Sequence, residues 1–216
     1  GFNTHDLIVD ASTFEDNDAG GDGGAIAVLK GDEIIVVDTH LIRNISGGDG
    51  GAVRIDRAEQ STGERLLLHG NSATDGGGAW FEKDTVKPGS LTNLLVVENI
   101  SDEGAGLYLD GVLDTYVVNN TLVGNDASSS GAHLFVSSGT VRFINNVFAW
   151  GQDGGGIYGD STAASGSDIY YNDAYANSGG EYAGSFTSQT GLSGNLDVDP
   201  DLKSYTIDGD ETNDDL

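Results

Sequence analysis

The sequence predicts an all-β fold, a parallel β-solenoid, from three observations. A short glycine-rich motif returns about every 27 residues, an apolar strand ending at an asparagine precedes most copies, and no stretch shows helical periodicity. A coil of 24–28 residues with two or three short strands cannot bury its inner face until another coil stacks on it. About seven coils fit the chain. They would form a rod about 35 Å long.

The glycine motif predicts one corner of each coil. It occurs in four copies spaced 27 residues apart and in three looser copies, at residues 23–26, 50–53, 77–80, 104–107, 130–133, 154–157 and 179–182. Paired glycines suit a corner at which side chains would collide or the backbone needs a positive φ.

The strand-ending asparagines predict a second corner. The first copy reads Phe14-Glu15-Asp16-Asn17, and later strands end at Asn44, Asn71, Asn99, Asn120, Asn146 and Asn172. Asparagine tolerates the left-handed region, and its amide can bond the asparagines above and below it. We therefore expect a ladder of stacked asparagines along the rod.

Alternation after the glycines predicts which side chains face the core. The pairs Ile26/Val28, Val53/Ile55, Leu107/Leu109 and His133/Phe135 would point inward, which makes His133 a core histidine. The outer face would then carry Ala27, Arg54, Phe81, Tyr108, Leu134 and Tyr158. Trp80 and Glu82 break the inward rule, and this leaves the register of their coil open.

Composition excludes several partners. The chain has 35 Asp and Glu against 9 Lys and Arg, a formal net charge of −26, so the phosphates of nucleic acids and anionic membranes would be repelled. No apolar stretch approaches the roughly 18 residues that a membrane helix needs, so we expect no membrane-embedded segment. The absence of cysteine excludes disulfides and cysteine-based zinc sites.

The two ends of the chain predict a piece of a longer, extracellular protein. Residues 1–10 contain no start methionine, basic segment or signal-peptide core, and the chain stops in the polar run DGDETNDDL. We expect residues 1–195 to form the β-helix. The acidic residues 196–216 would begin a further coil or a cap.

The GGA[I/V] motif paired with FxxN resembles the repeats of polymorphic outer-membrane proteins. More broadly, it resembles right-handed parallel β-helix proteins of the bacterial surface. The resemblance covers residues 12 to about 182, and residues 195–216 resemble the closing segment of many secreted β-helix proteins. It implies a single-stranded right-handed parallel β-helix, secretion, surface display and adhesion. It implies no single activity, because this fold carries lyases, hydrolases, adhesins and structural rods.

The catalytic sets of this fold are missing. Polygalacturonase-like β-helix enzymes carry N-T-D, D-D, G-H-G and R-I-K motifs as a set, whereas here the lone Asp pair, Asp214-Asp215, lies in the tail. A lyase would instead use a Lys or Arg base. Five of the nine basic residues fall within 34 positions, beside two coil insertions: Arg54, Arg57, Arg65, Lys83 and Lys87.

These basic residues suggest the lip of a groove for an acidic glycan. Arg54, Arg57 and Lys83 would bind its charges, and Phe81, Tyr108 and Tyr158 would offer rings for stacking. The plainer interpretation, which we prefer, is a set of solvated loop charges balanced by neighbouring carboxylates, namely Asp56, Glu59, Glu64, Glu82 and Asp84.

Stacked acidic residues suggest calcium. Gly-Gly-Asp-Gly-Gly occurs at 20–24 and 47–51, which places Asp22 beneath Asp49, with Asp75 and Asp153 near the same corner. Such carboxylates repel one another unless a cation joins them, and their oxygens suit Ca²⁺. The tail residues Asp208 and Asp210 resemble a D-x-D calcium loop. A salt-adapted acidic surface explains the same pattern.

The leading prediction is a non-enzymatic extracellular module: an adhesin, a rigid spacer or a filament-forming rod. Its partner would be a glycan or a cell-surface molecule, and the strand edges at the ends of a solenoid predict end-to-end self-association. The alternative is a protein that binds or cleaves acidic polysaccharide, of the lyase type, through a groove near residues 54–87.

Overall fold

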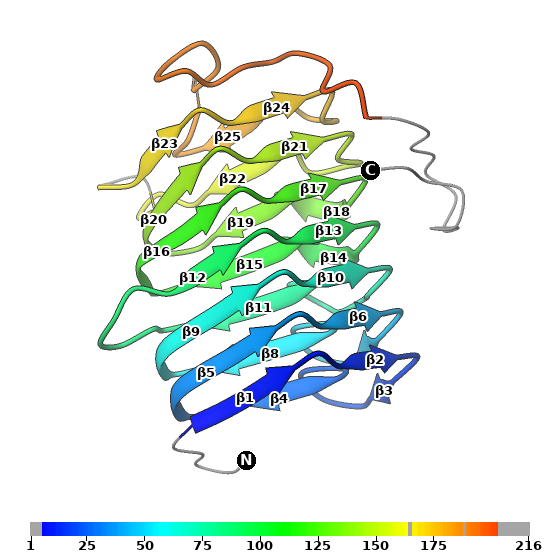
Figure 1. The fold of residues 1–216 in the computed structure, drawn as a ribbon. Helices are drawn as coiled ribbons and strands as arrows, with labels where there is room; N and C mark the ends of the chain where they lie inside the picture. Colours follow the sequence, from blue (N-terminus) through cyan, green and yellow to red (C-terminus); the bar gives the residue numbers. More distant parts are fainter. Residues whose placement is uncertain (1–5, 164–165, 188, 203–216) are drawn as a thin grey trace.

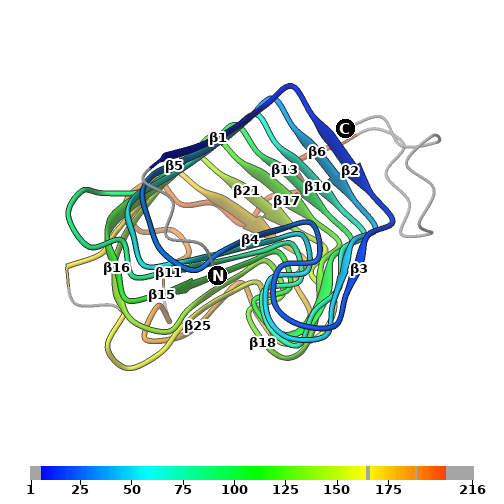
Figure 2. The ribbon, with the colours of Figure 1, turned by 90° about the horizontal axis from the view of Figure 1, so that it is seen from below.

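The computed structural model describes residues 6–163, 166–187 and 189–202, and these form a right-handed parallel β-helix of seven coils (Figure 1). Figure 2 looks along the rod from its N-terminal end, and the chain turns clockwise as it recedes. Every pairing between described strands is parallel, and these residues contain no helix, hence no helical membrane span. The fold predicted from the repeat is confirmed.

Three sheets run the length of the rod, and each coil adds one strand to each of them. The first sheet contains β1 (Asp6–Asp10), β5 (Gly31–Val37), β9 (Ala58–Glu64), β12 (Ser90–Thr92), β16 (Val112–Val118), β20 (Gly139–Ile144) and β23 (Asp168–Tyr170). The second contains β2 (Thr13–Glu15), β6 (His40–Ile42), β10 (Leu67–His69), β13 (Leu95–Val97), β17 (Thr121–Val123), β21 (Val147–Ala149) and β24 (Asp173–Tyr175). The third contains β4 (Ile26–Val28), β8 (Val53–Asp56), β11 (Ala79–Glu82), β15 (Leu107–Asp110), β19 (Leu134–Val136), β22 (Ile157–Gly159) and β25 (Tyr182–Gly184).

Two short sheets lie between the second and third sheets. They pair β3 (Asp18–Ala19) with β7 (Ile45–Ser46), and β14 (Ile100–Glu103) with β18 (Asp126–Ser130). Coils are numbered here from the N-terminus, so that coil one contains β1 to β4 and coil five contains β16 to β19.

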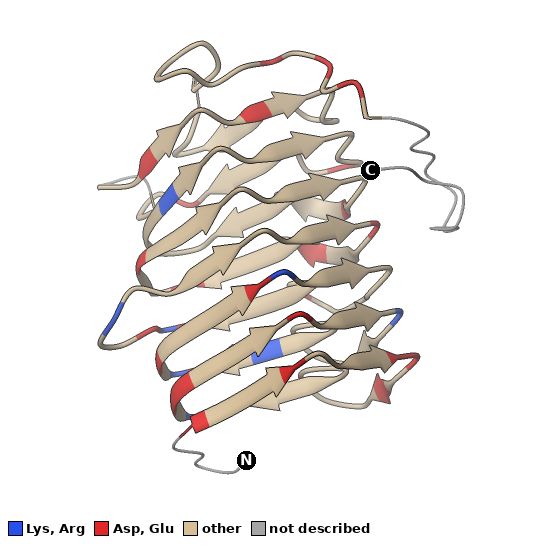
Figure 3. Ribbon diagram, in the orientation of Figure 1, with Lys and Arg blue, Asp and Glu red and all other residues tan. Residues whose placement is uncertain are grey.

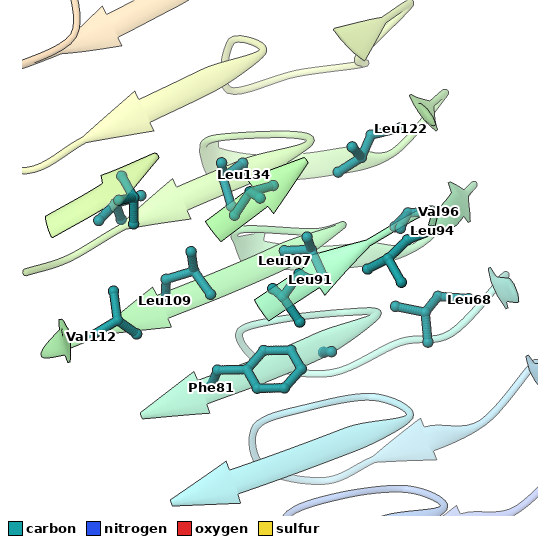
Figure 4. Packing of buried hydrophobic residues seen from close by; sticks show 14 of the residues in the cluster. Leu68, Phe81, Leu91, Leu94, Val96, Leu107, Leu109, Val112, Leu122 and Leu134 are labelled. Atoms are coloured by element: carbon teal, nitrogen blue, oxygen red, sulfur yellow. The ribbon is translucent and has the colours of Figure 1, made fainter. Parts of the chain in front are cut away.

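The core is a column of apolar side chains inside the coils. Leu68, Leu91 and Leu107 come from the second, first and third sheets, are almost fully buried and point toward one another (Figure 4). Because equivalent residues stack directly above each other, each coil covers the apolar face of the next.

The predicted faces are wrong in coil three. Phe81 pairs with Ile55 and Leu109 and is buried in the core (Figure 4). Trp80 occupies the outer position and pairs with Arg54 and Tyr108. The reason is a shorter spacing: the corner falls on Gly76, one residue before the place that a constant 27-residue period from Gly50 would give. A shift of one residue exchanges the two faces of a strand.

Coil five differs in the same way. Leu134 points inward and pairs with Leu107, so Phe135 faces outward above Tyr108. His133 is fully buried, as predicted, but it precedes the strand and does not occupy the position of Leu107.

The glycine corner is confirmed. At one stacked position of this corner every coil has a glycine with a positive φ: Gly23, Gly50, Gly76, Gly104, Gly131, Gly155 and Gly179. Coils six and seven have a second such glycine beside it, Gly154 and Gly180. A Cβ atom on Gly50 would lie 2.3 Å from the carbonyl oxygen of Val53. Any side chain here would therefore collide with the backbone as well as strain it.

The expected asparagine ladder is in fact two ladders at two corners. The first ladder follows the second sheet and contains Asn17, Asn44, Asn71, Asn99 and Asn125. The second ladder lies between the first and second sheets and contains Asn120, Asn146, Asn172 and Asn195. Both corners follow a short apolar strand, so a strand-ending asparagine does not by itself reveal which corner it occupies.

Each inner asparagine of a ladder uses its whole amide. The Asn71 Nδ2 atom donates to Asn99 Oδ1 at 2.9 Å and to the Leu41 carbonyl at 2.9 Å. Its Oδ1 accepts from the backbone and side-chain nitrogens of Asn44, at 2.8 and 3.0 Å. The ladder thereby satisfies buried backbone groups that the corner removes from the sheets.

The two ends of the rod differ. At the C-terminal end, Phe186 is buried over the core, Asn195 continues the second ladder and Leu196 pairs with Asp173. At the N-terminal end, β1, β2 and β4 are the last described strands of their sheets, and Leu7, Val9 and Phe14 are only partly buried.

Candidate functional site

The outer face of the third sheet carries a stack of aromatic rings. Trp80, Tyr108, Phe135 and Tyr158 occupy one outward position in coils three to six. Successive ring centroids lie 3.9, 4.8 and 5.2 Å apart, and the planes differ by 6°, 23° and 6°. We call these four residues the aromatic ladder. Sequence alternation predicts Tyr108 and Tyr158 on this face, whereas Trp80 and Phe135 require the corrected register.

The ring faces of the aromatic ladder are occupied. Tyr108 lies between Trp80 and Phe135, and the Arg54 guanidinium carbon lies 4.4 Å from the Trp80 ring centroid. Gly184 of coil seven lies so close to the Tyr158 ring that a Cβ atom on this glycine would be 3.0 Å from Cζ of Tyr158. Such stacking stabilises the face. It leaves the edges of the rings, and not their faces, toward a ligand.

Tyr108 is also surrounded by carboxylates. Burial raises the pKa of its hydroxyl to about 12, and the negative charges of Glu103, Asp75 and Asp110 add to this shift. Tyr108 therefore stays protonated at neutral pH and is no candidate for a catalytic base.

The basic residues do not form a single lip. Arg54 is largely buried and pairs with Asp49 at 3.0 Å and Glu82 at 2.7 Å. Arg65 lies at a different corner, between the first and second sheets, and pairs with Asp38 at 2.6 Å. Figure 3 shows basic segments scattered among the more numerous acidic ones.

Arg57 and Lys83 lie closer to the predicted arrangement. They occupy equivalent corner positions of coils two and three, directly after β8 and β11, and about half of each side chain is exposed. Arg57 pairs with Asp56 at 2.9 Å, and Lys83 pairs with Glu82. These pairs fit the plainer interpretation of balanced surface charges, although both cations remain accessible.

The acidic residues predicted to stack at one corner do so at Asp22 and Asp49, which lie on successive coils. The backbone N–H of Asp49 donates to Asp22 Oδ1 at 3.1 Å, and that of Glu103 donates to Asp75 Oδ1 at 3.0 Å. Burial raises the pKa of Asp49, Asp75 and Glu103, and neighbouring carboxylates add to the shift in each case. Backbone N–H groups thus join the successive coils where a bridging cation was expected.

No described group of three His, Asp or Glu side chains is arranged to hold a metal ion. Asp153 is exposed in a turn beside Gly154, and Asp208 and Asp210 lie outside the described residues. Calcium binding remains a prediction.

A buried carboxyl group lies beneath the insertion that follows β11. Asp84 is 5% exposed, and its Oδ1 accepts a hydrogen bond from the Ser61 hydroxyl at 2.7 Å. Burial raises the pKa of Asp84 to about 6, against the opposing effect of the Ser61 and Thr115 hydroxyls. A Cβ atom on Gly89 would lie 2.2 Å from Asp84 Oδ2, so the insertion closes over this carboxyl. Asp84 therefore anchors the insertion from below, and it is not one of the solvated loop charges that the sequence suggested.

Comparisons of the chain with protein-family models, with curated proteins and with solved structures found no match.

Proposed function

We propose that this protein is a non-enzymatic module of a secreted or cell-surface protein, built as a rigid rod that spaces or presents a binding surface. One observation supports this most directly: the polar and aromatic side chains suited to chemistry mostly connect one coil to the next. The amides form ladders, the rings stack on each other, and Arg54 joins Asp49 of its own coil to Glu82 of the next. The resemblance of the repeats to polymorphic outer-membrane proteins supports display at a surface.

Ion pairs on other faces of the rod also connect one coil to the next. Arg43 bonds Asp16 at 2.9 Å, and Arg142 bonds Asp114 at 3.0 Å, in each case across one coil boundary. Exposed pairs contribute little individually, at most about 1 kcal/mol each. Their repetition favours an ordered, stiff surface over a single reactive site.

The non-enzymatic part of the proposal is tested with a panel of acidic polysaccharides and Ca²⁺. The absorbance of unsaturated uronate should stay flat on prolonged incubation with the full chain. A rising absorbance would identify a lyase and overturn the proposal.

We further propose that the N-terminal coil supports end-to-end association, as the leading interpretation of the sequence suggests. The edges of β1, β2 and β4 offer backbone groups for pairing. Asp6 and Asp10 on β1 would repel an acidic partner, so association should increase with salt. Light scattering and electron microscopy should show rods longer than one chain at high salt. Monomers at every concentration and salt would contradict this part.

A second candidate function is binding of acidic polysaccharide through Arg57 and Lys83, because both side chains are accessible at one corner. The double variant Arg57→Ala with Lys83→Ala should then weaken polygalacturonate binding in affinity electrophoresis at least fivefold. Arg65→Ala, an exposed cation at another corner, is the control and should leave binding unchanged. Arg54 is unsuitable for this test, because it is largely buried and its removal would leave the partly buried Asp49 without its ion-pair partner.

A further inference from the structure

The first asparagine ladder lacks one member. In coil six the ladder position is occupied by Gly151, whose backbone N–H donates to Asn177 Oδ1 at 2.8 Å, as ladder residues do in the other coils. Without a side chain at this position, coil six has no ladder amide that could accept from Asn125 Nδ2 below or donate a side-chain hydrogen bond to Asn177 above. Two coil spacings, about 10 Å, separate those two asparagines.

His133 fills the gap. Its ring is fully buried, with Nδ1 3.0 Å from Asn125 Nδ2 and Nε2 2.8 Å from Asn177 Oδ1. The imidazole therefore connects coil five to coil seven through the space of the missing amide. The chain of hydrogen bonds continues to Glu181, whose carboxylate accepts from Asn177 Nδ2.

The hydrogen-bond network assigns the tautomer of His133. Asn125 Oδ1 already accepts from both nitrogens of Asn99, so Asn125 presents its NH₂ group to the ring. Nδ1 of His133 must then be the acceptor, and Nε2–H donates to the amide oxygen of Asn177. This arrangement requires a neutral ring.

Gly151 and His133 depend on each other for space. The residues equivalent to His133 in coils two to four are Ala52, Gly78 and Gly106, which project little or nothing into the ladder. A Cβ atom on Gly151 would lie 3.0 Å from His133 Nε2 and 2.9 Å from Asn177 Oδ1. A side chain at residue 151 would thus compete with the ring.

We propose that His133 is an acid-sensitive lock that holds coils six and seven to the rest of the rod. Protonation places a second N–H on the ring, opposite the NH₂ group of Asn125, so that two donors face each other in a buried site. Asn125 and His133 both belong to coil five, so this repulsion displaces the ring from its position, and the bond from Nε2–H to Asn177 of coil seven is lost with it. The Gly151 N–H and the second ladder continue to hold the C-terminal coils.

The surroundings favour the neutral ring. Burial lowers the pKa of His133 to about 4, and the Asn177 amide and Ala149 carbonyl oppose this only in part. The described groups placed against the ring from neighbouring elements include Asn125, Phe148, the Ala149 carbonyl and Asn177, and none of these titrates. Glu181 is one hydrogen bond further away and contacts Asn177.

The sign of the effect follows from linkage. An opened corner exposes a histidine with an ordinary pKa near 6.5, so the open state binds the proton more readily than the closed state. Opening of this corner should increase about a hundredfold between pH 7 and pH 4.

Hydrogen exchange of the full chain tests the lock, with rates corrected for the intrinsic effect of pH. Amides of residues 147–151 and 173–177 should lose about hundredfold protection between pH 7 and pH 4, beyond any loss at residues 41–44. The double variant His133→Gly with Gly151→Asn restores an amide at the missing position, and should not show this excess loss. His40→Gln, an exposed histidine on β6, is the control and should behave as the parent.

An excess loss that persists in the double variant would overturn the proposal. If that variant does not fold, the titration of His133 in the parent chain, followed by NMR, decides instead. A midpoint below pH 5 with the proton on Nε2 is expected. A midpoint at pH 6 or above would refute the lock.

Discussion

The lower and upper coils of this rod are held by different corners. From coil one to coil five the corner after the second sheet carries an unbroken asparagine ladder, while the corner between the first and second sheets carries unlike residues, among them Thr39, Leu66 and Leu94. From coil five upward that second corner carries asparagines, and the first ladder continues through His133.

Coil five belongs to both regions. Asn120 begins the second ladder there and Asn125 continues the first, so the two ladders overlap for one coil. The difference teaches that each coil from the second onward has at least one corner with a fully used amide, but not always the same corner. The alternative, a buried corner with unsatisfied backbone groups, costs about 1–3 kcal/mol for each group.

The largest effect should come from removing one amide within a ladder. Asn71→Ala in the lower region removes four hydrogen bonds, among them those to the buried Asn44 N–H and to the Leu41 carbonyl. We expect a loss of about 3–5 kcal/mol in the free energy of unfolding, measured with urea.

The same change in the upper ladder sharpens the comparison. Asn146 makes the same four kinds of bond, to both nitrogens of Asn120, to the Val117 carbonyl and to Asn172. Asn146→Ala should therefore cost as much as Asn71→Ala within about 1 kcal/mol. A much smaller loss would show that the ladders are not equivalent.

The two regions should also respond oppositely to pH. Asp84, in coil three, has a folded-state pKa of about 6 against an ordinary value of 3.8, so its contribution to stability is present at low pH and is lost as pH rises from about 4 to 6. Asp84→Asn should stabilise the protein at pH 7 by up to about 3 kcal/mol and have little effect at pH 4.

Urea unfolding at the two pH values measures this difference, with Glu59→Gln, an exposed neighbour, as the control. His133, in coil five, has the opposite sign, because its lowered pKa makes acid destabilising. An Asp84→Asn variant that gains stability equally at both pH values would contradict the titration of a buried carboxyl.

The smallest effect should come from the exposed start of the first ladder. Asn17 donates to Asn44 Oδ1 at 2.7 Å, but no described coil lies beneath it and water can reach its amide. Asn17→Ala should cost less than about 1 kcal/mol in urea unfolding. A loss as large as that of Asn71→Ala would mean that ladder position, not burial, sets the energy.

Local chemistry along the chain determined the architecture. The period, the glycine corner and the position of Asp22 beneath Asp49 all follow from residues spaced one coil apart, because stacking places such residues in contact. Glycine was needed at its corner whatever the neighbouring coils contained, since a Cβ atom would strike the backbone.

Only the tertiary structure decided which face and which corner each residue occupies. A coil shorter by one residue placed Trp80 outside and Phe81 in the core, and two similar strand ends divided the asparagines between two ladders. His133 of coil five takes the place of the side chain that Gly151 of coil six lacks. Because the two residues lie in different coils, no local sequence pattern reveals this substitution. Register is a property of paired strands, and it is set only when a coil meets its neighbours.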